Sequence, residues 1–320
     1  MKAIFQTGYG SPDFFELKEV DKPAIKDYEV LVKVHAAALH AGDLFFMRGV
    51  PKMVRLAAGL PRPKNYIPGY DVAGQVEDVG KNVTQFQLGD EVFGSGQSTC
   101  AELVCVKEKN IISKPASLTF EEAAAIPTSA LSALHGIRDI GKVQKGQKVL
   151  INGASGGVGT YAVQISKALG AEVTGVCSAR NVDLVRSIGA DHVIDYTQMD
   201  FTQSGQKYDL ILDQVANHSL SACRRALTPQ GMHIPNSGNS GLGYIIKALI
   251  SSLFIGQQGR TYLSVPKKQD LVVLKDLVET GKVKPVIDRT YSLNKTTEAF
   301  RYMEEVHASG KVVITMEHKN

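Results

Sequence analysis

The chain has 320 residues, of which 43% are hydrophobic and 21% are charged, and its formal net charge is +4 at pH 7. This length accommodates two domains of ordinary size, and the composition excludes a disordered chain. Because basic and acidic residues are interspersed, the charge gives no argument for nucleic-acid binding, although it is compatible with a small anionic ligand.

The first part of the chain is rich in short β-type segments, such as 2–5, 30–34 and 90–93, separated by glycine and proline turns. It predicts an antiparallel β domain up to about residue 120. From about residue 121, helical patterns alternate with short apolar runs, which indicates βαβ units and a parallel sheet. We place its strands at 148–151, 172–176, 192–194, 210–212 and 232–234.

The C-terminal part returns to the first pattern. After a helical segment at 268–280, it continues with the stretch 283–291, a helix at 296–307 and a last strand at 312–315. We therefore predict a discontinuous first domain, residues 1–122 and 284–320, and a second domain at 123–283. The predicted fold class is α/β, a Rossmann-type doubly wound parallel sheet beside a β-rich domain.

The cysteines and the apolar segments indicate the cellular compartment and the relation to membranes. The four cysteines form no CxxC pair, so we expect neither a structural zinc lobe nor a disulfide framework. The N-terminus has no pattern of a signal peptide, and a reducing, cytoplasmic location is predicted. The longest apolar stretch, 244–255, contains Lys247 and is too short for a bilayer, so stable membrane insertion is not expected, whereas peripheral contact stays open.

A glycine-rich loop is the strongest motif. It begins at Gly153, continues through Ser155, Gly156, Gly157 and Val158, and stands between an apolar strand and the helical run 161–169. In this context, backbone N–H groups and a helix N-terminus can face a pyrophosphate. The alternative is a tight strand-to-helix turn that binds no ligand.

The end of the second strand of this unit indicates which dinucleotide is bound. An NAD-preferring unit has an acidic residue there, but the chain continues with Ser178 and Arg180, a hydroxyl and a guanidinium suited to a 2′-phosphate. We therefore predict NADPH as the cofactor. Alternatively, Arg180 is a solvated residue at a helix start, and Tyr196 either lies against the same phosphate or only packs.

Landmark motifs extend over nearly the whole chain, at segments 1–3, 69–74, 79–80, 89–92, the glycine loop, 189–191 and 309–313. In these segments the chain resembles the zinc-independent quinone oxidoreductase branch of the medium-chain dehydrogenase/reductase superfamily. Residues 177–181 and the ending look similar to the plastid-envelope quinone oxidoreductase homologues and to bacterial alkenal/quinone reductases. The resemblance implies a GroES-like catalytic domain, a Rossmann domain, a cleft between them and a homodimer.

The resemblance also implies the residues of a cofactor site. These are Thr128, Ser155, Gly156, Gly157, Val158, Ser178, Arg180, Tyr196, Asp213, Gln214, Val215, Ala216 and Lys311. Zinc members of the superfamily hold a catalytic metal at positions that carry His40, Tyr70 and Thr128 here. Because tyrosine and threonine are poor zinc ligands, we expect no metal and a reaction that proceeds without zinc.

Three residues are candidates for the chemistry. Tyr70 or His40 can donate a hydrogen bond or proton to a developing oxyanion, and Asp43 lies nearby in the expected site. Each has an ordinary alternative: a hydrogen-bonded structural histidine, an aromatic side chain of the cleft wall, and a carboxylate that orients its neighbours. His40 replaces an asparagine that is frequent among the related reductases.

Two further segments are candidates for closing a site. Residues 50–61 are predicted to form a short amphipathic lid with a basic edge, and 236–243 a glycine-rich loop near the nicotinamide. The leading hypothesis is an NADPH-dependent reductase of a quinone, an alkenal or another enone. The alternatives are an alcohol dehydrogenase or carbonyl reductase, and a non-catalytic NADPH-binding protein.

Overall fold

The computed structural model describes residues 1–50, 52, 55–56, 59–64, 66–236, 258–260, 262 and 264–317. It divides the chain into two compact units. Unit 1 comprises residues 1–129, 266–279 and 285–320, and unit 2 comprises residues 130–265 and 280–284. The predicted lid is described only in part, and the loop 237–243 and the apolar run 244–255 lie outside the described residues.

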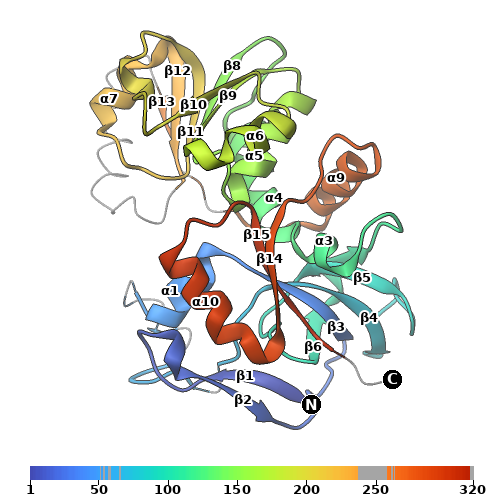
Figure 1. Cartoon of the computed structure of the whole chain (residues 1–320). Coiled ribbons are helices and arrows are strands. Elements are labelled where there is room, and N and C mark those ends of the chain that lie inside the picture. Colours follow the sequence, from blue (N-terminus) through green and yellow to red (C-terminus); the bar gives the residue numbers. More distant parts are fainter. Residues whose placement is uncertain are drawn as a thin grey trace. The chain divides into compact units, whose positions relative to one another are not determined.

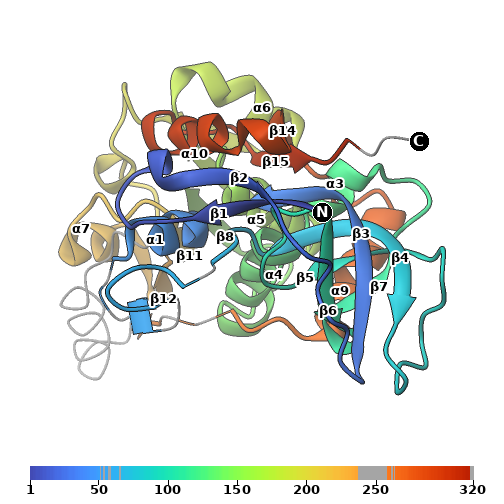
Figure 2. The same ribbon diagram turned by 90° about the horizontal axis from the view of Figure 1, so that it is seen from below.

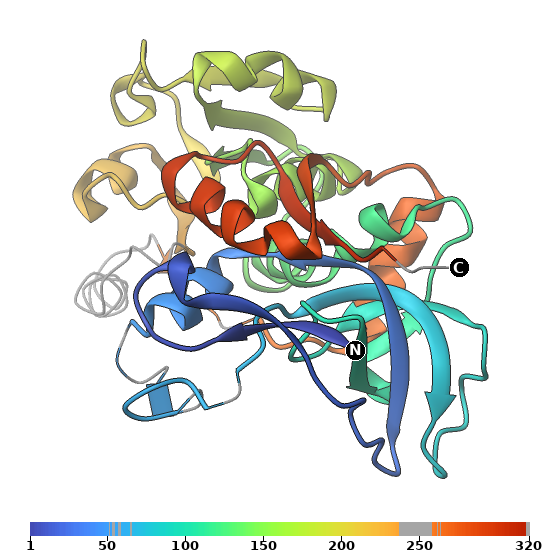
Figure 3. The same ribbon diagram turned by 60° about the horizontal axis from the view of Figure 1, so that its bottom comes forward.

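Unit 1 is built on β-sheet. Its strands are β1 (Lys2–Gln6), β2 (Phe15–Glu19), β3 (Glu29–Leu39), β4 (Asp71–Val79), β5 (Glu91–Ser95), β6 (Leu103–Lys107), β7 (Ile111–Ser113), β14 (Ile287–Ser292) and β15 (Lys311–Thr315). Strands β1 and β2 form a separate antiparallel pair, which Figure 2 shows side by side. The larger sheet has the order β14-β15-β3-β4-β5-β7, with β6 paired to β3. The long strands β3 and β4 curve together through it (Figure 3).

The expected antiparallel character holds for this sheet except at one edge, where β14 and β15 run parallel. The connection between them contains η6 (Leu293–Lys295) and α10 (Thr296–Glu305), which is long enough for a parallel return. The α10 helix is anchored to β2 by an edge-to-face contact of Phe300 with Phe15, whose ring centroids are 4.6 Å apart. The C-terminal tail thus completes the larger sheet of unit 1.

The other helices and short turns of unit 1 lie between these strands. They are η1 (Pro12–Phe14), α1 (Ala41–Arg48), η2 (Glu108–Asn110), α3 (Phe120–Ala124) and α9 (Lys268–Glu279). The helix α4 (Pro127–Leu134) continues across the division into unit 2. A capping box starts α3, because the Thr119 hydroxyl accepts from the Glu122 N–H and the Glu122 carboxylate accepts from the Thr119 N–H.

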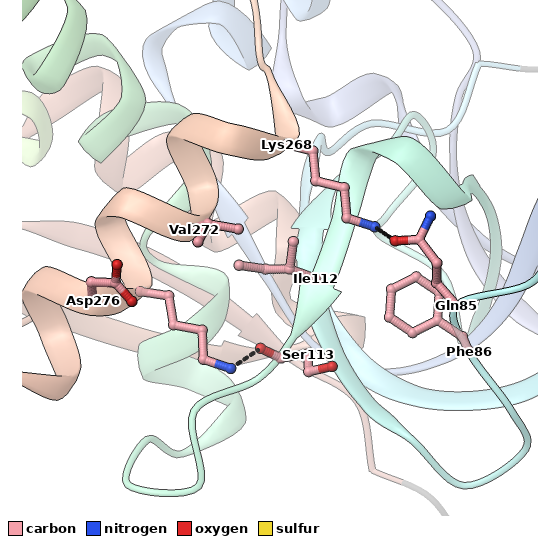
Figure 4. A pocket seen from close by; sticks show the side chains of 8 residues that line it. Gln85, Phe86, Ile112, Ser113, Lys268, Val272 and Asp276 are labelled. Atoms are coloured by element: carbon pink, nitrogen blue, oxygen red, sulfur yellow. Dashed lines mark hydrogen bonds between the residues drawn. The ribbon is translucent and has the colours of Figure 1, made fainter.

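The helix α9 groups with unit 1, although its segment was expected in the second domain. Its side chains explain this difference, because Lys268 Nζ donates to Gln85 Oε1 at 2.6 Å and Lys275 Nζ donates to the Ser113 carbonyl at 3.3 Å. Figure 4 shows Lys268 reaching from the helix to Gln85. A cavity of about 340 Å³ lies between them, and Phe86 also lines it. None of the predicted site residues lines this cavity.

Unit 2 contains the expected parallel sheet. Its strands are β8 (Lys148–Asn152), β9 (Glu172–Cys177), β10 (His192–Asp195), β11 (Tyr208–Asp213), β12 (Leu227–Pro235) and β13 (Gln258–Gly259). All of them pair in parallel in the order β10-β9-β8-β11-β12-β13, the arrangement of a doubly wound nucleotide-binding sheet. The predicted α/β fold class is confirmed.

Helices connect these strands. They are η3 (His135–Ile140), α5 (Gly157–Ala168), η4 (Ala179–Asn181), α6 (Val182–Ser187), η5 (Phe201–Gln203) and α7 (Leu220–Arg225). The α5 helix packs on β8 and β9, and α6 packs on β9 and β10 (Figure 1). The inner strands are almost continuously buried, as expected for a parallel sheet with helices on its faces. Among the described residues, no helix is long and apolar enough to cross a membrane.

Candidate active site

The glycine loop joins β8 to the N-terminus of α5. Gly153 has a φ of +86°, which favours glycine, and Gly156 is the N-cap residue of α5. A Cβ added at Gly159 would lie 2.0 Å from the Gly153 carbonyl oxygen, so no side chain fits there. A Cβ at Gly156 would meet only that oxygen, at 3.5 Å, which leaves space at the helix N-terminus. This arrangement fits a pyrophosphate.

A buried asparagine connects this loop to the turn after β9. Asn181, 6% exposed, donates from Nδ2 to Ser155 Oγ at 3.0 Å and to Ser178 Oγ at 3.4 Å. The bridge brings two predicted cofactor residues together. Asn181 was not among the predicted site residues, although an asparagine at the start of a helix was a signal that its side chain has a local partner.

The carboxyl ends of β9 and β10 meet at one edge of the sheet. The strands are paired with Asp195 opposite Cys177, and the Tyr196 N–H donates to the Cys177 carbonyl at 3.1 Å. Ser178 and Tyr196 therefore follow neighbouring strand ends. Arg180 is exposed and the Tyr196 side chain is 53% exposed, so both can reach a ligand at this edge.

The turn after β11 lies next to the glycine loop, because Asp213 at the end of β11 is paired with Asn152 at the end of β8. Asp213 is fully buried, and its Oδ1 accepts from the N–H groups of Val215 and Ala216 at 3.1 and 2.8 Å. Asp213 is thus placed to hold this turn, and Val215 is 38% exposed beside it. Burial raises the pKa of Asp213, but hydrogen bonds from His233 and from this turn outweigh burial and leave the pKa below its usual value.

In unit 1, His40 and Asp43 stand at the start of α1. The His40 N–H donates to Asp43 Oδ2 at 2.8 Å, and the ring Nδ1 lies 3.6 Å from the same oxygen. A Cβ at Gly42 would lie 2.6 Å from the His40 ring, so a larger residue at this position would displace the imidazole. Burial raises the pKa of Asp43. This carboxylate holds the helix start and the histidine together.

Tyr70 lies beside His40, with ring centroids 6.1 Å apart at an interplanar angle of 74°. Burial, and after it the neighbouring Asp71, raises the pKa of the Tyr70 hydroxyl. The hydroxyl therefore stays protonated at neutral pH, where it can act as a donor. The structure thus brings together the three residues predicted for the chemistry.

Asp71 organises a second group in unit 1. It is fully buried at the start of β4, and its Oδ1 accepts from the Thr128 N–H at 3.0 Å and from the Thr128 hydroxyl at 2.5 Å. Lys311, 2% exposed, donates to Ser129 Oγ at 3.1 Å and places Nζ 3.5 Å from Asp71 Oδ2. Thr128 and Lys311 therefore meet through Asp71, which was not among the predicted site residues.

The three positions that hold zinc elsewhere in the superfamily do not fit a metal here. Thr128 uses its hydroxyl to donate to Asp71, and Tyr70 has a raised pKa, so neither offers an anionic ligand atom. Among the described residues, His40 belongs to no group of three side chains with converging metal-ligand atoms. We derive no zinc-dependent step at this site.

Comparisons with known proteins agree with this architecture. The GroES-like domain of alcohol dehydrogenases matches residues 26–136, and the domain described as zinc-binding dehydrogenase matches residues 188–314. The chain is 33% identical to the chloroplast envelope quinone oxidoreductase homolog of Arabidopsis thaliana, with 98% of both chains covered. The chain belongs to the medium-chain dehydrogenase/reductase superfamily.

Two further comparisons find similarity to a relative named as an enone reductase and to a solved quinone oxidoreductase. The chain is 33% identical to 2-methylene-furan-3-one reductase of Solanum lycopersicum, covering 98% of the chain and 79% of that relative. The quinone oxidoreductase of Coxiella burnetii superimposes with a TM-score of 0.88 at 28% identity, covering 99% of both chains. The predicted superfamily, its GroES-like domain and a nicotinamide-dependent oxidoreductase are confirmed.

Proposed function

We propose that this protein is an NADPH-dependent reductase of quinones, alkenals or other enones that acts without zinc. One observation carries the proposal: the zinc positions of the superfamily hold an imidazole, a protonated phenol and a hydroxyl already engaged by Asp71. Hydroxyl and imidazole donors suit an acceptor whose carbon is already electron-poor, because such an acceptor needs only stabilisation of a developing oxyanion. The names of the plant relatives, a quinone oxidoreductase homolog and an enone reductase, support the same substrate class.

The preference for NADPH is argued from the edge formed by β9 and β10. Ser178, Arg180 and Tyr196 stand there, and β9 ends in Cys177, without the carboxylate that binds ribose hydroxyls in NAD-dependent units. A guanidinium and two hydroxyls supply donors for a 2′-phosphate, and Asn181 holds Ser178 toward the glycine loop. We propose Gly153, Ser155, Gly156, Gly157 and Val158 as the residues around the pyrophosphate.

Bound NADPH supplies a hydride to the acceptor. The residues of unit 1 then have two tasks. Tyr70 donates a hydrogen bond or proton to the oxygen on which charge develops, with His40 as the neighbouring donor. Asp43 acts as a positioning residue, because its carboxylate holds the His40 backbone. Thr128 and Lys311 stay predictions as cofactor contacts, as do the homodimer and the cytoplasmic location.

The test is the rate of nicotinamide oxidation by purified, chelator-treated protein with one enone, one quinone and one plain ketone. We expect oxidation of NADPH with the enone or the quinone, at a rate that the chelator does not change. Turnover of the ketone alone, or loss of activity with the chelator, would support an alcohol dehydrogenase or carbonyl reductase instead. Tight NADPH binding without turnover of any acceptor would support a binding protein.

The cofactor preference has a separate test in Arg180→Ala. Loss of a hydrogen bond to a charged group costs about 1.5–3 kcal/mol, so the KM for NADPH should rise about 10- to 100-fold while the KM for NADH stays the same. Arg186→Ala is the matched control, because Arg186 is also an exposed arginine of this segment and lies near Asp183. An equal rise of both constants in Arg180→Ala would contradict a 2′-phosphate contact.

A further inference from the structure

A buried histidine lies behind the turn that follows β11. His233 belongs to β12, is 1% exposed, and places Nε2 3.3 Å from Oδ2 of the fully buried Asp213. An ionised carboxylate can only accept hydrogen bonds, so Nε2 carries the proton and donates. The lowered pKa of Asp213 agrees with an ionised carboxylate at neutral pH. His233 therefore fixes one oxygen of Asp213.

The second oxygen of Asp213 is left for the turn. Oδ1 accepts from the N–H groups of Val215 and Ala216, and also from Asn152 Nδ2 at 2.8 Å. Ala216 has a φ of +57°, a conformation that costs a side-chain-bearing residue energy and that these hydrogen bonds hold in place. The turn conformation thus depends on the orientation of one carboxylate.

Asn152 connects the same carboxylate to the glycine loop. Its Nδ2 also donates to Asn217 Oδ1 at 3.1 Å, and its carbonyl oxygen accepts from the Gln214 N–H at 3.0 Å. The two segments are close, since a Cβ at Gly153 would lie 3.0 Å from Val215 Cγ2. The turn and the dinucleotide loop are therefore held as one assembly at the carboxyl edge of β8 and β11.

We propose that His233 is a positioning residue for the dinucleotide, acting through Asp213 on the turn at residues 213–217. The inference rests on the dinucleotide site of the proposed function. Without the His233 hydrogen bond, the Asp213 carboxylate is free to rotate. The donors of the turn and of Asn152, which now share Oδ1, can then bond to different oxygens. The turn then loses the geometry in which it borders the glycine loop, and the dinucleotide binds less tightly.

A metal site is the other use of this cluster, because ligand atoms of Asp213, Cys223 and His233 lie within 4.8 Å of one another. The hydrogen bonds argue against it. Asp213 already accepts from Val215, Ala216, Asn152 and His233, so its oxygens are occupied by donors. Stoichiometric zinc in the purified protein would overturn the positioning role.

The test compares His233→Leu, which removes the donor, with His233→Gln, whose side-chain amide nitrogen can replace Nε2. The dissociation constant of NADPH is measured by fluorescence titration without any acceptor. We expect a roughly tenfold increase for His233→Leu and a return to within about threefold of the wild-type value for His233→Gln. Val173→Ala is the control, because it shortens a fully buried side chain of β9, a strand that pairs with neither β11 nor β12.

A second measurement needs no ligand. Amide hydrogen exchange at Val215 and Ala216 should accelerate about tenfold in His233→Leu and stay unchanged in His233→Gln. A wild-type dissociation constant in His233→Leu, or an equal increase in Val173→Ala, would overturn the inference. NADPH binding without reduction of any acceptor would remove the proposed function and leave this inference intact, whereas a protein that binds no dinucleotide would overturn both.

Discussion

The buried pair of Lys311 and Asp71 offers the sharpest test of the structure. We consider Lys311→Met, which keeps the aliphatic stem and removes the ammonium. Lys311 is 2% exposed and Asp71 is fully buried, so the substitution leaves an ionised carboxylate with the two Thr128 donors as its remaining partners. A carboxylate in that state is costly, because water cannot replace the lost cation.

The magnitude follows from the geometry. At the 3.5 Å separation of Nζ and Oδ2, two unit charges attract by about 5 kcal/mol at an effective dielectric constant of about 20. Removing one partner of a buried pair costs about 3–5 kcal/mol, so Lys311→Met should lower the free energy of unfolding of unit 1 by that amount. The double variant Lys311→Met/Asp71→Asn should lose much less unfolding free energy than the two single variants lose in sum, because no charge is left unpaired.

The assay is urea unfolding followed by circular dichroism, since the sequence contains no tryptophan. Lys107→Met is the matched control: Lys107 is an exposed residue of β6, and its replacement should change stability by less than about 0.5 kcal/mol. A cost below about 1 kcal/mol for Lys311→Met, or additive costs in the double variant, would refute the pairing of Lys311 with Asp71.

Three further predictions concern single positions. Gly159→Ala should abolish dinucleotide binding in a titration and lower the free energy of unfolding by about 1–3 kcal/mol, because its Cβ would lie 2.0 Å from a backbone oxygen. Gly156→Ala should weaken dinucleotide binding and leave stability unchanged, because its Cβ would meet no atom closer than 3.5 Å. Asp43→Asn should raise the free energy of unfolding at neutral pH, because burial raises the folded-state pKa of Asp43 and penalises its ionised form. In urea unfolding, this gain in stability should disappear as the pH falls toward 3.8, the ordinary pKa of the group in an unfolded chain. A gain that does not depend on pH would contradict this explanation. Ala216→Gly should raise the thermal midpoint through a gain of about 0.5–1 kcal/mol, since its φ of +57° suits glycine; a lower midpoint would show that the turn tolerates alanine without strain.

Local patterns of the sequence were sufficient to predict the dinucleotide-binding sheet. Strand-to-helix alternation located β8 to β12, and the glycines identified the loop after β8, because tight turns and close backbone approach need residues without side chains. Residue types at single positions, such as Tyr70, also carry the expectation of a reaction without zinc, which stays a prediction. These properties depend on neighbours within a few residues, which is why periodicity and motif spacing reveal them.

The partners of the buried polar groups were decided by the tertiary structure. Lys311 meets Asp71 across 240 positions, and His233 meets Asp213 across 20. Helix α9 also joins unit 1 by side-chain contacts that its own pattern does not show. A buried charge must find a partner wherever packing brings one, so its role depends on which distant strands become neighbours. The sequence by itself determined the fold and the position of the glycine loop, and the pairing of strands decided which side chains contact that loop and Asp71.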